Sequence, residues 1–142
     1  MIKGVVINQE LVSELAGLGH GHTFVVCDAG FPIPAGGKKI DLALVEGVPT
    51  IPQVLKAILS ESIVEEVVYC EEMEAFSPAL CAEYKRMFAA QTKLTPQWAQ
   101  FELMARQAKF FIRTGDFTPY GNIILKSASG VRQFNEKFDI TF

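Results

Sequence analysis

The chain has 142 residues, of which 49% are hydrophobic and 20% are charged, and its formal net charge is −3. This length is that of one domain, and the composition is that of a globular protein, which excludes an intrinsically disordered chain. The slightly acidic balance argues against a nucleic-acid-binding protein, which would carry a basic face or stripe. No apolar run reaches the roughly 20 residues of a membrane-spanning helix, and we do not expect the N-terminal segment to be a signal peptide.

The first half of the chain contains signals for two helices and three strands. Asn8 is a typical N-cap, and apolar residues at helical spacing after it predict a helix. An unbroken apolar run predicts a buried strand at Thr23–Cys27, and alternation predicts another at residues 39–44, after a loop rich in Pro and Gly. Pro52 predicts the first turn of a helix, and the β-branched run at residues 63–70 predicts a third strand.

The second half continues the alternation of helices and strands. The pairs Ser77-Pro78 and Thr95-Pro96 each predict the start of a helix, the second over residues 97–109. Strands are expected at residues 110–112 and 123–125, and the tail at residues 134–142 is expected to be an edge strand or an arm. Such alternation is typical of the α/β class, and we expect a single three-layer α/β/α domain with a mostly parallel mixed sheet.

Three cysteines, Cys27, Cys70 and Cys81, lie far apart in segments with strand or helix patterns. Their odd number and wide spacing do not form a disulfide framework, and they lack the close spacing of zinc ligands. Free thiols of this kind fit a protein of the reducing cytoplasm.

The two histidines of the chain, His20 and His22, lie in a Gly-His-Gly-His segment between a predicted helix and a predicted buried strand. Imidazole titrates near neutrality and is the most frequent general acid or base. Asp28 follows that strand at its carboxyl end, where open sheets bind ligands, so the three side chains form a candidate acid–base cluster. The alternatives are a surface turn with incidental histidines, a turn-forming aspartate and, with less support, a His-x-His metal site.

A second polar segment, Thr-Pro-Tyr-Gly-Asn at residues 118–122, directly precedes a predicted buried strand. The hydroxyl of Tyr120 and the amide of Asn122 both donate and accept hydrogen bonds, which suits the many hydroxyls of a sugar. Because Pro, Gly and Asn all favour turns, a plain turn is the alternative interpretation.

Several sequence blocks stand in a fixed order and spacing. They are Leu-Gly-His (18–20), Val-Val-Cys-Asp-Ala-Gly-Phe-Pro-Ile-Pro (25–34), Ile-Asp-Leu-Ala-Leu (40–44) with Gly-Val-Pro (47–49), Ile-Arg-Thr-Gly-Asp (112–116) and Pro-Tyr-Gly-Asn-Ile-Ile-Leu (119–125). Together they resemble the D-ribose pyranase / L-fucose mutarotase family over about residues 1–130. The Asp-Ala-Gly-Phe-Pro-Ile-Pro and Ile-Asp-Leu-Ala-Leu blocks are closer to the ribose branch, and Gly-His-Gly and Tyr-Gly-Asn-Ile to the fucose branch. We expect one domain over residues 1–142, with residues 131–142 as an atypical C-terminal extension.

The resemblance implies a cytoplasmic enzyme that interconverts ring forms of a monosaccharide of the D-ribose or L-fucose type, without a cofactor or metal. It implies that His20 is the proton donor, that Asp28 contacts the sugar or holds His20, and that Tyr120 and Asn122 bind sugar hydroxyls. It also implies a homodecamer of two stacked pentamers, with the sugar site between neighbouring subunits. Ring opening and closing require only proton transfer, so one positioned imidazole can serve.

Two residues depart from the ribose branch. Trp98 stands where that branch has a histidine at the start of a helix, and Glu102 stands near a position that can be lysine. We expect Trp98 to line the pocket, with its flat face on the C–H face of the sugar, and to favour a 6-deoxyhexose. The alternative for Trp98 is a tryptophan that only fills the core.

The alternative function of the protein is that of a non-catalytic monosaccharide-binding or regulatory protein on the same fold.

Overall fold

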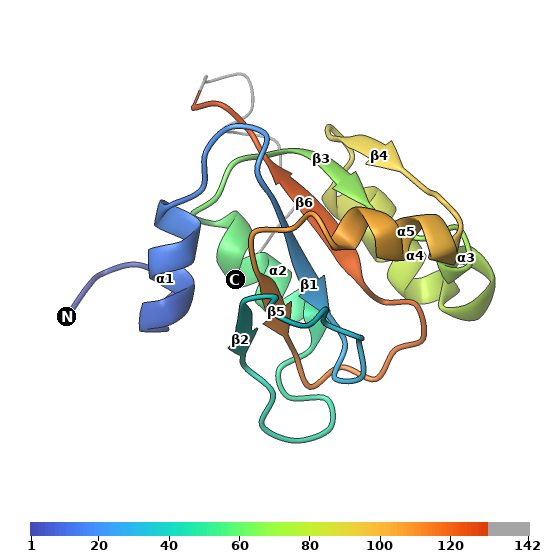
Figure 1. Ribbon diagram of the computed structural model, residues 1–142, viewed down its shortest axis with the longest axis horizontal. Coiled ribbons are helices and arrows are strands. Elements are labelled where there is room, and N and C mark those ends of the chain that lie inside the picture. The colour runs from blue at the N-terminus through green and yellow to red at the C-terminus, as the bar shows by residue number, and fades with distance from the viewer. Residues whose placement is uncertain (131–142) are drawn as a thin grey trace.

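The computed structural model describes residues 1–130, so the strand or arm expected at residues 134–142 lies outside the described residues. Within residues 1–130 the chain forms five helices and six strands, which are interspersed along the sequence and fold around one sheet (Figure 1). The helices are α1 (Gln9–Ala16), α2 (Ile51–Leu59), α3 (Met73–Phe76), α4 (Pro78–Met87) and α5 (Trp98–Ala105). The strands are β1 (Thr23–Cys27), β2 (Lys39–Asp41), β3 (Val64–Val68), β4 (Thr92–Leu94), β5 (Phe111–Arg113) and β6 (Ile123–Ser127).

The strands form one sheet in the order β2-β5-β1-β6-β3-β4. The pairs β2·β5, β5·β1 and β3·β4 are parallel, and β6 runs antiparallel to both of its neighbours. The predicted mixed, mostly parallel sheet is therefore confirmed. Because β6 is reversed, its first residue lies at the same edge of the sheet as the last residues of β1 and β5.

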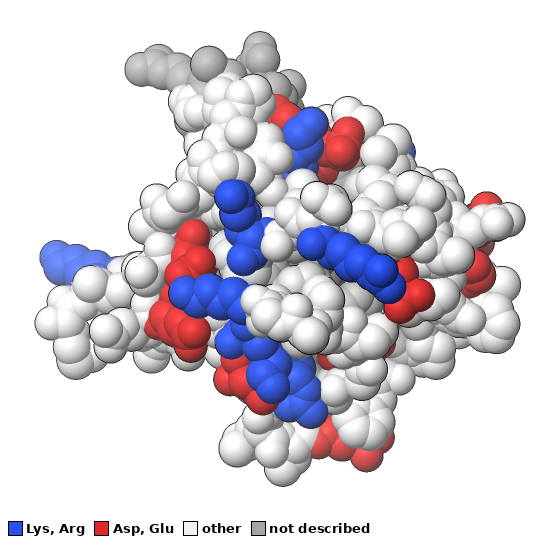
Figure 2. Space-filling model, viewed as in Figure 1, with Lys and Arg blue, Asp and Glu red and all other residues white. Residues whose placement is uncertain are grey.

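Helices cover both faces of the sheet, which confirms the three-layer architecture. The larger core lies between one face and helices α1, α2 and α4, where Phe24 of β1 packs in the same cluster as Leu55 and Tyr84. The smaller core lies on the opposite face, where α5 contributes Phe101 and Ala105 (Figure 1). No helix among these residues is long and apolar enough to cross a membrane. Figure 2 shows basic side chains near the middle of the face in view, with acidic side chains beside them.

Local signals account for most helix starts. The Asn8 side chain accepts a hydrogen bond from the Leu11 backbone N–H at 2.9 Å, which confirms the predicted N-cap. Thr50 and Gln53 form a capping box at the start of α2. The helix at Ser77-Pro78 also starts as predicted, but Ser77 does not cap it: its hydroxyl donates to the carbonyl oxygen of Pro119 at 2.6 Å.

Other elements differ from the predictions. The second strand ends at Asp41 rather than at residue 44, because the chain leaves the sheet and exposes Leu44 and Val45. Helix α5 ends at Ala105 rather than near residue 109. The short elements α3 and β4 were not predicted, and β4 is a three-residue edge strand that its parallel pairing with β3 defines.

Candidate functional site

A reciprocal polar pair lies at the edge of the sheet where β1 ends and β6 begins. Asn122 donates from Nδ2 to Oδ2 of Asp28 at 3.0 Å, and the backbone N–H of Asp28 donates to Oδ1 of Asn122 at 2.8 Å. Asn122 is buried, whereas Asp28 is partly exposed. Asp28 also accepts the Gly30 N–H at 2.9 Å, so it forms the turn, as the alternative interpretation of this residue predicts. Its carboxylate nevertheless lines a cavity as well.

An aromatic wall faces this pair. The rings of Trp98 and Tyr120 lie 5.6 Å apart edge to face, and Trp98 is also edge to face with Phe31 at 6.1 Å. Trp98 further stacks on Phe101 at 5.5 Å, so it both packs against the core and lines the cavity. Tyr120 adopts a φ of 57°, in the left-handed region that an aromatic residue rarely occupies. Backbone strain of this kind clusters at binding sites.

These groups enclose a cavity of about 330 Å³, which we call the Asp28 cavity. Its lining residues are Asp28, Gly30, Phe31, Pro32, Trp98, Pro119, Tyr120 and Asn122. Four of the five predicted site residues therefore meet in one place. A carboxylate, an amide and a phenol beside aromatic rings can bind the hydroxyls of a small polar ligand and pack on its apolar face.

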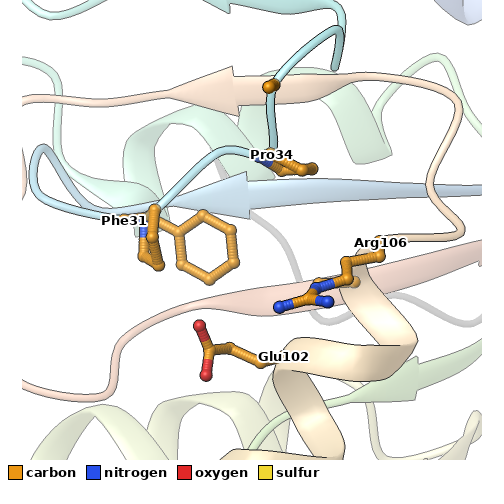
Figure 3. Close-up of a pocket in the computed structure, with 7 residues that line it drawn as sticks. Phe31, Pro34, Glu102 and Arg106 are labelled. Atoms are coloured by element: carbon orange, nitrogen blue, oxygen red, sulfur yellow. The ribbon is translucent and has the colours of Figure 1, made fainter.

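A second cavity, of about 320 Å³, adjoins the Asp28 cavity and shares Phe31 and Pro32 with it. Figure 3 shows Glu102 and Arg106 projecting from α5 into this second cavity, opposite Phe31 and Pro34. Glu102 thus lies one helical turn beyond Trp98 and lines the neighbouring space rather than the Asp28 cavity itself.

His20 lies at the opposite end of β1. The backbone N–H of Gly21, next to it, donates to the carbonyl oxygen of Ser127 at the end of β6. The five residues of β1 rise about 3.3 Å each, so roughly 16 Å separates the two ends of the strand. The expected cluster of His20, His22 and Asp28 is therefore not formed within one chain, because an extended strand holds the histidines and the aspartate apart.

The two histidines have different surroundings. His20 is exposed over 60% of its side chain, and its Nε2 lies 3.0 Å from Oε2 of Glu65. Lys126 lies 3.3 Å from the other oxygen of Glu65. His22 accepts the Gly19 backbone N–H at Nδ1 and closes the turn. For His22, the alternative interpretation of a histidine in a surface turn therefore holds.

The sequence patterns did not single out Glu65, Lys126 or Glu72. Glu72 accepts the Trp98 backbone N–H at 3.0 Å at the start of α5, where Gln97 makes no side-chain cap. This hydrogen bond lowers the pKa of Glu72. No local pattern reveals these roles, because the contacts join residues that are distant in the sequence.

The cysteine thiols and the potential metal ligands of the described residues bear on the same chemistry. Burial raises the pKa of Cys27 to about 12 and that of Cys70 to about 11, so neither is a thiolate nucleophile near neutral pH. Over residues 1–130, no group of three or more His, Cys, Asp or Glu side chains is placed to hold a metal ion.

Comparison with known proteins identifies the family. The model of the RbsD / FucU transport protein family matches residues 1–131. D-ribose pyranase 1 of Rubrobacter xylanophilus is 43% identical over 126 residues, and D-ribose pyranase of Geobacillus thermodenitrificans is 42% identical over 127 residues. Each alignment covers 89% of this chain and 96% of the relative. The chain belongs to the RbsD / FucU family, as the sequence blocks indicated.

Solved structures agree. Bacillus subtilis RbsD complexed with D-ribose matches with a TM-score of 0.89 and 35% identity, covering 92% of this chain and 100% of that one. The fucose mutarotase of Streptococcus pneumoniae in complex with L-fucose has a TM-score of 0.65 at 23% identity and covers 88% of this chain and 95% of that one. The latter shares the fold.

Proposed function

We propose that the chain is a sugar ring-form isomerase whose site is shared between two subunits: the Asp28 cavity of one subunit holds the monosaccharide, and His20 of another transfers the proton. Interconversion of sugar ring forms is the class of activity that the D-ribose pyranase and fucose mutarotase relatives carry in their names. The conserved fold and the matched length, 96% of each D-ribose pyranase, support its assignment here.

One observation carries the shared site. The Asp28 cavity contains groups that bind hydroxyls but no imidazole, while His20 lies exposed at the other end of β1. If a second copy places the end of its β1 that carries His20 against the Asp28 cavity, the cavity gains an imidazole and the site is complete. Such a contact joins two different surfaces of the chain, so it is a head-to-tail contact. Repeated from subunit to subunit, head-to-tail contacts form a ring when the last subunit meets the first. This supports a ring-shaped homo-oligomer, and the homodecamer of two stacked pentamers remains what the family resemblance implies.

Exposed apolar side chains are available for contacts between subunits. Leu44 and Val45 beyond β2 and Phe117 beside the Asp28 cavity are each more than half exposed, at 77%, 62% and 63%. The N-terminal segment, with Ile2 at 58%, extends away from the body of the domain (Figure 1). These side chains are available to pack against a second copy of the chain.

The reaction needs only proton transfer. The ring oxygen gains a proton as the anomeric hydroxyl loses one, and the bond between the anomeric carbon and the ring oxygen breaks. The open-chain carbonyl form then closes with the proton transfers reversed, through another hydroxyl to give the other ring size or on the other face of the carbonyl to give the other anomer. An imidazole supplies and removes these protons, which is worth about 10²–10⁴-fold. Asp28 and Tyr120 would hold the hydroxyls meanwhile, and Trp98 would pack on the C–H face.

The sugar and the compartment are parts of the same proposal. Trp98 adds apolar surface to the Asp28 cavity, so we expect ring exchange with L-fucose as well as D-ribose. The three cysteines are free and buried, which supports a reducing compartment such as the cytoplasm.

A mixing experiment tests the shared site. We expect His20→Ala and Asp28→Asn to be inactive separately in exchange NMR of ribose and fucose. Random co-assembly at equal amounts places an intact cavity beside an intact histidine at about a quarter of the sites, and activity should return to that extent. No recovery, with both variants present in one oligomer, would show that the site lies within one chain. Sugar signals that broaden without faster exchange in the unmutated protein would instead identify a non-catalytic binding protein.

A further inference from the structure

We propose that Glu65 is the positioning residue for His20: its carboxylate fixes the imidazole through Nε2 and leaves Nδ1 to face the sugar, while Lys126 anchors the carboxylate. The inference rests on the proposed role of His20 and adds two residues to it. It follows from the contacts at the edge of the sheet opposite the Asp28 cavity.

The geometry is that of an imidazole held by a carboxylate. His20 Nε2 lies 3.0 Å from Glu65 Oε2, so Nε2 carries a hydrogen that it donates to the carboxylate. Nδ1 is then the nitrogen that can exchange a proton with a substrate. A carboxylate behind a catalytic histidine selects the tautomer, orients the ring and stabilises the imidazolium that forms during proton transfer.

The sheet is irregular where it presents Glu65. Strands β3 and β6 pair in antiparallel register at Val64 with Ser127 and at Glu66 with Lys126, and the register shifts between Val64 and Glu66. Glu65 is the residue inside this shift. Bulges of this kind turn a side chain out of the normal alternation and are frequent beside active sites. The irregularity thus directs the Glu65 carboxylate to both His20 and Lys126.

The charges support a permanently ionised carboxylate. The side chain of Glu65 is only 18% exposed, against 60% for His20. Burial alone would raise the pKa of Glu65, but the hydrogen bonds from His20 and Lys126 outweigh it and lower the pKa below its ordinary value. Glu65 therefore remains an acceptor for His20 throughout the neutral range.

If Glu65 only holds His20 in place, removing its carboxylate should lower kcat and leave the affinity for the sugar nearly unchanged. Glu65 is not part of the Asp28 cavity, so its removal should leave the KM for the sugar nearly unchanged. We expect Glu65→Ala to lower kcat about 10- to 100-fold, the usual effect of losing a partner behind a ligand or catalytic histidine. Glu65→Gln keeps a side-chain acceptor and should lose less. Glu66→Gln is the matched control, because Glu66 lies next to Glu65 on β3 and makes no hydrogen bond to His20 within residues 1–130. This variant should behave like the unmutated protein.

A second readout does not depend on activity. The chain has only two histidines, so ¹⁵N-histidine labelling gives a simple spectrum that His20→Ala assigns. We expect His20 to be the Nε2-protonated tautomer, and Glu65→Ala to shift it toward a mixture. If His20→Ala abolishes exchange while Glu65→Ala preserves both kcat and the tautomer, the positioning role of Glu65 is wrong and the proposed function stands. If His20→Ala is itself fully active, the proposed function fails first.

Discussion

Asp28 and Asn122, 94 positions apart in the sequence, hold each other through two hydrogen bonds, of 2.8 Å from the Asp28 backbone N–H and 3.0 Å from the Asn122 side chain. The pair ties the end of β1 to the start of β6 directly beneath the Asp28 cavity. Because Asn122 is buried and both of its amide atoms are engaged, it fixes the direction of the Asp28 carboxylate rather than adapting to a ligand.

Asn122→Ala should therefore weaken both the fold and the site. The substitution leaves the Asp28 N–H and one carboxylate oxygen without their partner, which costs about 1–3 kcal/mol. We expect a lower denaturation midpoint in urea and weaker ribose binding by saturation-transfer NMR. Asn8→Ala is the matched control: it removes the N-cap of α1 at about 1 kcal/mol and should leave sugar binding intact. Equal sugar affinity in Asn122→Ala would contradict the role of the pair.

His20→Ala should abolish ring exchange and leave the oligomer intact. His20 is exposed and contributes little to the core, so light scattering should give the same mass for the variant and the unmutated protein. The expected loss of exchange rate is about 10²–10⁴-fold, the contribution of a positioned acid or base. His22→Ala should lose less than tenfold, because His22 supports the turn through the Gly19 N–H. Near-normal exchange rates in His20→Ala would show that the proton donor is a different group.

Trp98→His should move the substrate preference toward D-ribose. The indole gives the Asp28 cavity an apolar wall that favours the methyl group of a 6-deoxyhexose, and an imidazole would replace it with a polar contact. The ratio of exchange rates for L-fucose and D-ribose, measured on both proteins, decides the matter. An unchanged ratio would mean that Trp98 serves only the packing against Phe101 and Phe31.

Stability should fall steeply at alkaline pH. Burial raises the pKa of the Cys27 thiol from 9.0 to about 12 and that of Cys70 to about 11, so both stay protonated in the folded chain after the unfolded chain has lost those protons. The unfolded state then binds fewer protons, and the stabilisation present below pH 9 is lost as the pH rises toward 11 and 12. Urea midpoints from pH 7 to 11 measure this decline. Cys27→Ala should flatten the curve, and an equal slope in that variant would refute the assignment.

Much of the fold and part of the site are determined by the sequence alone. Asn8 marks a helix start because an N-cap bonds to a backbone N–H only a few residues away, and the apolar run at Thr23–Cys27 defines a buried strand by itself. The blocks that contain Asp28 and residues 118–122 also indicated the family and three predicted residues of the Asp28 cavity, Asp28, Tyr120 and Asn122. The fourth, Trp98, was found as a departure from the family pattern. These signals are local or lie in motifs, so they can be recognised without coordinates.

The tertiary structure alone decided which of these residues meet. The reversal of β6 brings Asn122 to Asp28, and the five-residue length of β1 sends His20 to the opposite edge of the sheet. Glu65, 45 positions from His20, becomes its partner only through the register shift between β3 and β6. The physical reason is that strand direction and register depend on pairing energies summed over the whole sheet, and no segment of the chain contains that information by itself.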